Sequence, residues 1–167
     1  MKKLVLLLGL AMFGMLAPHG ARAQAVQVFG GYSYLRLDTQ PGNANLNGWE
    51  VSGTINGSWL GFTADFSGDY GSPFGPSTSL NTFLFGPQFS LPLPRVSPFV
   101  HALVGAARLS TGGASGTVFA GALGGGIDTK IAPFFSYRVI QVDYLATRFG
   151  GSTQNNLRIS TGLVFRF

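Results

Sequence analysis

Residues 157–167, LRISTGLVFRF, decide the class of fold. The odd positions of this stretch are mainly apolar and end on Phe165 and Phe167, whereas the even positions include Arg158 and Arg166. Because side chains alternate between the two faces of a β-strand, the stretch predicts a strand with one apolar and one polar face.

The same period of two recurs upstream. Residues 49–56 place Trp49 and Ile55 on one face and Glu50 on the other, and residues 60–70 alternate in the same way around Asp65. Weaker segments of this kind cover residues 26–37, 80–89, 99–109, 118–128 and 134–145. The segment at 99–109 is apolar on both faces except for two residues, His101 and Arg108.

One of these segments contains a break in register. Arg138 and Asp143 are both charged but have opposite parity within residues 134–145. A β-bulge would place both side chains on one face, and a position of Asp143 above the apolar band would also explain the pattern.

Long and short connections alternate between the segments. Polar stretches rich in Gly, Pro and Asn cover residues 38–46, 71–79, 110–117 and 146–156, and shorter links lie near Gly57, 90–97 and 129–133. Eight strands of about 9–12 residues joined in this way are typical of an antiparallel up-and-down barrel that crosses a bilayer.

The N-terminal segment has the pattern of a secretory signal peptide. Lys2 and Lys3 precede an apolar run over residues 4–16, and Ala21-Arg22-Ala23 supplies a small-residue cleavage site. The run is shorter than a membrane-spanning helix requires, so we expect cleavage before Gln24. Residues 24–167 then form one β-barrel domain.

Composition narrows the class of protein. Charged residues make up 10% of the chain, and it contains 25 Gly, 15 Phe and no Cys. Beyond Ala23, eight Lys and Arg stand against six Asp and Glu without a basic cluster, so we expect no nucleic-acid partner. No later apolar run is long enough for a membrane helix, which leaves a closed barrel as the membrane-spanning option.

Alternation alone does not say which face points outward, because a soluble lipocalin-like barrel also alternates, with its apolar face inside. Three features favour apolar side chains facing lipid: the low content of charge, the aromatic residues near strand ends, and the terminal Phe167. The in-phase residues Leu163, Phe165 and Phe167 resemble the signal that the outer-membrane assembly machinery reads.

Several stretches resemble the OmpA-like outer-membrane β-barrel family, a small porin-like barrel domain of Gram-negative and acidobacterial envelopes. They are VFGGYSYLR (28–36), GFTADFSG (61–68), GGGIDTKI (124–131), VIQVDYLATRF (139–149) and RISTGLVFRF (158–167). The resemblance covers nearly all of residues 24–167 and implies eight antiparallel strands with a mainly polar interior. It implies a fold and no particular activity.

With the apolar faces outward, a set of polar and charged residues points into the lumen. These residues are Glu50, Asp65, Asp69, His101, Asp128, Arg138, Arg158 and Arg166. Since an unpaired buried charge is costly, we expect an ion-pair network that plugs the barrel. A gate that opens by re-pairing of the arginines, or a ligand or catalytic site, are the alternatives.

The pattern favours a structural or weakly porin-like protein of the outer membrane. The absence of Cys and the single His beyond residue 23 give no metal-ligand spacing, so we expect no metal and no cofactor. We also expect no enzymatic activity, a monomer, and outer-membrane lipids as partners. A lipid-modifying enzyme and a surface-binding module that acts through the outer loops remain alternatives.

Overall fold

Eight antiparallel strands form a closed barrel in the computed structural model, which describes residues 25–39, 42–72, 75–149 and 152–167. The expected signal peptide lies outside the described residues. The strands are β1 (Ala25–Thr39), β2 (Gly42–Asn56), β3 (Leu60–Gly71), β4 (Thr78–Ser90), β5 (Val96–Thr111), β6 (Ala114–Ala132), β7 (Phe135–Phe149) and β8 (Ser152–Arg166). Each strand pairs with its neighbours in sequence, and β1 pairs with β8. The eight-stranded up-and-down topology predicted from the sequence is confirmed.

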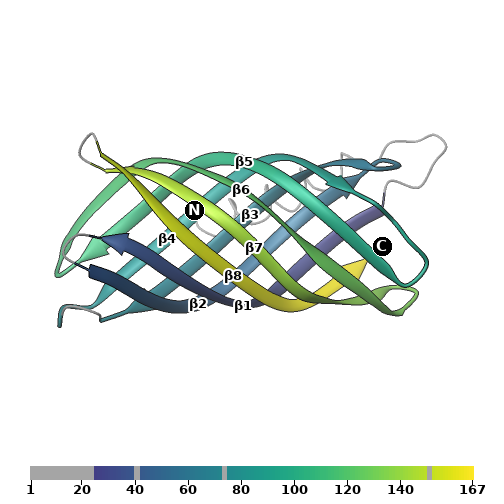
Figure 1. Cartoon of the computed structure of the whole chain (residues 1–167), viewed down its shortest axis with the longest axis horizontal. Coiled ribbons are helices and arrows are strands. Elements are labelled where there is room, and N and C mark those ends of the chain that lie inside the picture. The colour runs from purple at the N-terminus through teal and green to yellow at the C-terminus, as the bar shows by residue number, and fades with distance from the viewer. Residues whose placement is uncertain (1–24, 40–41, 73–74, 150–151) are drawn as a thin grey trace, which may run out of the picture.

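The barrel has two ends with different contents. The start of β1 and the end of β8 lie at one end, called the terminus end below, and Val26 and Phe167 close it through two backbone hydrogen bonds of 3.2 and 2.9 Å. The strands are tilted with respect to the long axis (Figure 1). Strands β1, β3, β5 and β7 end, and β2, β4, β6 and β8 begin, at the opposite end, called the distal end.

The strands are longer than the sequence indicated, and most of the expected long loops are wrong. Strand β6 contains 19 residues, and β1, β2, β7 and β8 contain 15 each. A 15-residue strand extends about 50 Å, so the hairpins continue beyond the stretch that crosses a bilayer. Most residues of 38–46, 110–117 and 146–156 pair across these hairpins, although their polar composition is equally compatible with loops.

The β5–β6 connection shows how short a distal turn can be. Thr111 pairs with Ala114, and the two residues between them, Gly112 and Gly113, have φ values of 57° and 91°. Glycine adopts positive φ without steric cost, and two such residues in succession suit a tight hairpin turn. The expected loop over 110–117 is therefore a two-residue turn.

A β-bulge in β7 explains the parity of Arg138 and Asp143. On the β8 side the register shifts between Arg138 and Gln141, and on the β6 side it shifts beside Asp128. Val139 and Ile140 are consecutive and both exposed, so the side chains on either side of them return to the same face. Arg138 and Asp143 consequently both point into the lumen.

Apolar side chains cover the outside of the barrel. Trp49, Val51 and Ile55 of β2 are exposed, whereas the alternate residue Glu50 is fully buried. Trp59 lies in the β2–β3 turn and is exposed, with its ring edge-on to that of Phe89 at a distance of 5.2 Å between ring centres.

Candidate functional site: the charged network and the apolar plug in the lumen

Arg158 of β8 is the centre of the polar part of the lumen. Its guanidinium lies 2.8 Å from Asp143 Oδ2, 3.0 Å from Asp65 Oδ1 and 3.5 Å from Glu50 Oε2. All four side chains are buried. Removal of charges from water costs several kcal/mol per ion, so the group is tolerated only because each carboxylate faces the same guanidinium.

Neutral and aromatic partners complete this centre. Gln141 Nε2 donates to Glu50 Oε1 and to Asp143 Oδ2, both at 2.7 Å, and the hydroxyl of Ser160 donates to Glu50. His101 Nε2 lies 2.7 Å from Asp143 Oδ1. Strand packing leaves room for Asp143 only because residue 124 is glycine: a Cβ there would overlap Asp143 Oδ1.

A second cluster lies nearer the terminus end around Arg138. Its Nε donates to Asp128 Oδ1 at 2.8 Å and its Nη1 donates to Gln141 Oε1 at 2.6 Å, which joins the two clusters. The guanidinium carbon is 4.3 Å from the ring centre of Phe29 and 4.2 Å from that of Phe99. Arg138 is therefore held between two aromatic faces as well as by charge.

The structure brings together most of the residues that the sequence pointed to. Glu50, Asp65, His101, Asp128, Arg138 and Arg158 are buried in the lumen and connected as described above. Arg166 joins through Asp128, 3.2 Å from its Oδ2. Asp69 is buried but makes no ion pair within the described residues; its partner is the hydroxyl of Ser67 at 3.4 Å.

Two central residues were absent from the expected lumen network. The opposite parity of Asp143 and Arg138 left the position of Asp143 open between a bulge and a place above the apolar band, and the bulge brings Asp143 to Arg158, Gln141 and His101. Gln141 is neutral, and nothing in the sequence distinguishes it as a lumen residue.

A cluster of apolar side chains, which we call the apolar plug, lies in the distal half of the lumen beside the buried polar residues Asp69, Thr82, Thr147 and Asn156. Its buried members are Leu35, Leu37, Ala44, Leu46, Leu80, Leu84, Leu103, Ala107, Ala120, Ala122 and Leu145. Leu109 and Val118 pack against them. The buried residues are mainly polar, as the family resemblance implies, but in the distal half six strands also contribute inward-facing Leu or Ala, which the resemblance did not predict.

The lumen has little of the geometry that catalysis or metal binding requires. No group of three or more His, Cys, Asp or Glu within the described residues could hold a metal ion. His101 Nδ1 has no hydrogen-bond partner, and no serine or threonine hydroxyl within the described part of the chain bonds to the ring. The arrangement can hold charges and block passage.

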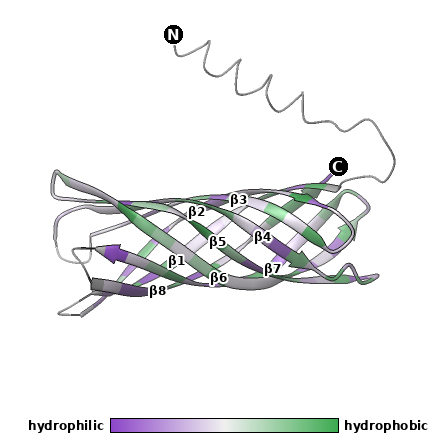
Figure 2. Cartoon of the chain, turned by 90° about the horizontal axis from the view of Figure 1, so that it is seen from above, coloured by the Kyte–Doolittle hydropathy of each residue, from purple (hydrophilic) through white to green (hydrophobic). Residues whose placement is uncertain are grey.

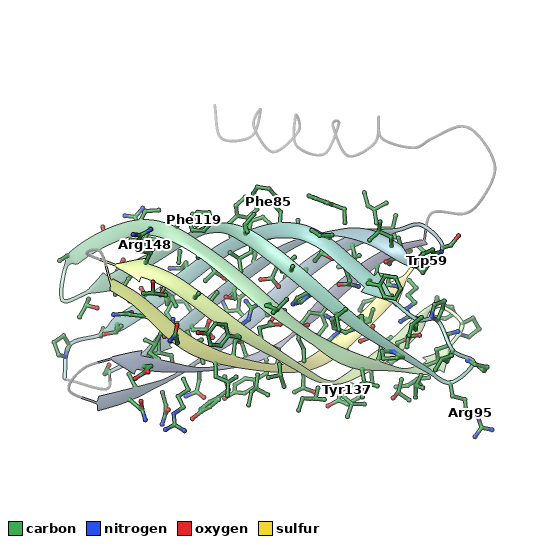
Figure 3. All side chains as sticks on the ribbon, turned by 45° about the horizontal axis from the view of Figure 1, so that its top comes forward. Trp59, Phe85, Arg95, Phe119, Tyr137 and Arg148 are labelled. Carbon is green, nitrogen blue, oxygen red and sulfur yellow. The ribbon has the colours of Figure 1, made fainter. Side chains whose placement is uncertain are left out.

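The outside of the barrel is an apolar belt between two charged rims. Phe85, Phe119 and Tyr137 point outward along its length, with Arg148 toward the distal end and Arg95 at the terminus end (Figure 3). The end of β1 and the start of β8, both at the distal end, are hydrophilic and appear purple in Figure 2. Leu163, Phe165 and Phe167 lie on this outer face at the terminus end.

No helix in the described segments is long and apolar enough to cross a membrane.

Comparison with solved structures identifies the architecture. The crystal structure of Neisserial surface protein A superposes with a TM-score of 0.69, at 15% sequence identity, over 87% of this chain and 100% of the other. The chain has the fold of a small outer-membrane β-barrel. No protein-family model matches the chain, and no curated protein matches its sequence.

Two further small outer-membrane barrels share the fold. The attachment invasion locus protein Ail of Yersinia pestis gives a TM-score of 0.56 at 17% identity, over 86% of this chain and 100% of Ail. The N-terminal β-barrel domain of Pseudomonas aeruginosa OprF gives 0.54 at 12% identity, over 86% of this chain and 98% of that domain. At these identities the likeness concerns the fold alone.

Proposed function

We propose that this protein is an integral component of the bacterial outer membrane, where it serves a structural role as a barrel closed to solutes. The observation that carries the proposal is the belt of outward apolar side chains between two charged rims. In water such a surface would promote aggregation, whereas hydrocarbon accommodates it. The outer-membrane barrels that share the fold support the location.

The contents of the lumen support a structural role over a porin-like one. The charged network occupies the half toward the termini, and the apolar plug occupies the distal half. An eight-stranded barrel has an interior just wide enough for side chains to fill. A hydrated ion would have to lose water as it passes the leucines of the plug, and the four polar side chains beside them, Asp69, Thr82, Thr147 and Asn156, would replace only part of its hydration shell.

The native chain contains no Cys, which allows a direct test of the membrane location. Single cysteines would replace Asn45 near the distal end, Val142 in the belt and Arg95 at the terminus end, all exposed positions. In intact cells a membrane-impermeant maleimide should label Asn45→Cys, and it should label Arg95→Cys only after the outer membrane is permeabilised. It should not reach Val142→Cys in either case.

Equal labelling of all three variants in intact cells, or recovery of the protein in the soluble fraction, would contradict the proposal. Each variant needs the unheated-versus-heated gel shift of a folded barrel as its control. This control separates a misfolded variant from a wrong location.

A second candidate function is surface binding at the distal end. A groove of about 530 Å³ lies there between the β3–β4 connection and the β5–β6 turn, lined mainly by Ser, Thr and Gly residues such as Ser77 and Thr111. Ail, which shares the fold, is named an attachment protein and has been solved with the heparin analogue sucrose octasulfate. Replacement of Ser77 and Thr111 by Trp should abolish cell attachment if this groove binds a partner, whereas Ser58→Trp at the terminus end should not.

A further inference from the structure

Most acidic side chains of the barrel point into the lumen, and most basic ones lie on its outer surface. Five acidic side chains point into the lumen, and they are Glu50, Asp65, Asp69, Asp128 and Asp143. On the outside, the exposed charged side chains of the described residues are Arg36, Asp38, Arg95, Arg108, Lys130 and Arg148. None of the five basic ones forms an ion pair within that part of the chain. Among the described residues, the outer surface therefore has basic side chains without ion-pair partners at both rims.

Arg108 stands at the edge of a groove on this outer surface. The groove has a volume of about 400 Å³ and crosses β2 to β6. Its lining residues are Trp49, Phe66, Ser67, Asn81, Thr82, Phe83, Ala106, Arg108 and Thr117. The small side chain of Ala106 lies between Phe83 and Phe119 across the sheet, which makes the hollow.

The groove changes from apolar to polar between one outward-facing row of residues and the next. Toward the belt, Phe66 and Phe83 stack with ring centres 4.6 Å apart. Two residues further toward the distal end, Asn81 pairs with Arg108, and Arg108 pairs with Thr117. A guanidinium flanked by an amide and a hydroxyl thus lies directly above an aromatic, apolar floor.

We propose that this groove binds one phosphorylated glycolipid of the distal leaflet, a lipid of the lipid A type. Its phosphate would bind Arg108 beside Asn81 and Thr117, and an acyl chain would lie along Phe66, Phe83 and Ala106. Arginine matches phosphate with parallel charge-assisted hydrogen bonds, and the outward faces of β3 to β6 carry no acidic residue to oppose it.

The next residues toward the distal end favour a saccharide headgroup over a simple phospholipid. Tyr70, Ser79, Ser110 and Ser115 lie one outward position beyond the arginine row, and Ser115 Oγ already accepts a hydrogen bond from Arg108 Nη2 at 3.2 Å. Hydroxyl groups at this height suit sugar hydroxyls that project above the acyl chains. The inference rests on the proposed outer-membrane location.

Trp49 provides the readout, because it lines the groove and the chain has only two Trp. In a Trp59→Phe background, the folded barrel in detergent is titrated with bisphosphorylated lipid A or with phosphatidylglycerol while Trp49 fluorescence is recorded. We expect a saturable change with lipid A that Arg108→Gln weakens by about tenfold or more, since one charge-assisted interaction is lost. Ala106→Phe, which fills the hollow, should abolish the change.

Arg148→Gln is the matched control, because Arg148 is exposed at the same end, makes no ion pair within the described residues and lies outside the groove. It should bind lipid A as the parent does. Equal binding by the Arg108→Gln variant, or equal saturation with phosphatidylglycerol, would overturn the glycolipid site. Failure of the parent to show a heat-dependent gel shift would instead overturn the proposed barrel in the membrane.

Discussion

Arg158 and Leu84 are both fully buried in the same lumen, yet opposite interactions hold them there. Arg158 needs three carboxylates within 3.5 Å, supplied by β2, β3 and β7. Leu84 belongs to the apolar cluster of the plug, at its border with the charged network, where Asp65 is its cross-strand neighbour on β3. The polar half depends on the partners of each charge, whereas the plug depends on volume, so the two halves should respond differently to substitution.

The largest effect is expected at the centre of the polar half. Arg158→Met would leave Glu50, Asp65 and Asp143 buried without their shared cation, which should lower the free energy of unfolding by about 3–5 kcal/mol. Urea unfolding followed by tryptophan fluorescence measures the change. Arg148→Met on the outer rim is the control and should change the free energy of unfolding by less than about 0.5 kcal/mol. Similar losses in both variants would deny the network a stabilising role.

In the plug, stability should depend on the volume of the buried side chains and not on their charge. Leu84→Ala would leave a cavity and lower the free energy of unfolding by about 3 kcal/mol, with no dependence on salt. Leu123→Ala is the matched control on the outer face, where detergent chains replace the lost contacts, and it should cost less than about 1 kcal/mol. If both leucines cost the same, the distal lumen is not tightly packed.

Arg138 is stabilised both by its ion pair and by its aromatic neighbours. A substitution that keeps the charge should therefore separate the two contributions to the free energy of unfolding. Arg138→Lys keeps a cation beside Asp128 but loses the planar contact with Phe29 and Phe99 and the fork geometry. We expect a loss of about 1–2 kcal/mol in the same unfolding experiment. Arg138→Ala should cost more; equal costs would mean that the charge contributes nothing.

The smallest effect on stability is expected outside both halves. Phe167 is exposed at the end of the chain, so Phe167→Asp should change the free energy of unfolding of the refolded barrel by less than about 1 kcal/mol. Its amount in the outer membrane of cells should nevertheless fall, because charge replaces the terminal aromatic of the expected assembly signal. Quantitative blotting of membrane fractions tests this, with Phe167→Tyr as the control. A normal amount of the Phe167→Asp variant would remove Phe167 from that signal.

Alternation along the strands, together with the rhythm of the connections, predicts the topology, and the low charge and the aromatic residues near strand ends indicate which face is outside. Glu50 and Arg158 were placed in the lumen because their neighbours in sequence are apolar at every second position. Alternation reports the face and not the height within the barrel. The contacts of Arg158 with three other strands depend on tilt and register, which only the structure provides.

The apolar plug could have been suspected from one segment. Residues 99–109 are apolar on both faces, which is unexpected for a strand between lipid and a polar lumen. Elsewhere the inward leucines of β1, β2 and β4 lie in short or polar stretches, so their contribution to a common cluster was hidden. The predicted loop lengths were wrong for a related reason. Polar residues at strand ends are compatible either with a loop or with a hairpin that extends into water.

Single-channel recording in a planar bilayer tests the closed lumen most directly. Refolded protein whose gel mobility shifts on heating would be inserted, and current would be recorded under an applied voltage. With the charged network paired and the apolar plug packed, the wild-type barrel should insert and remain silent. Discrete, reproducible openings of the wild-type protein would contradict the account and establish a pore.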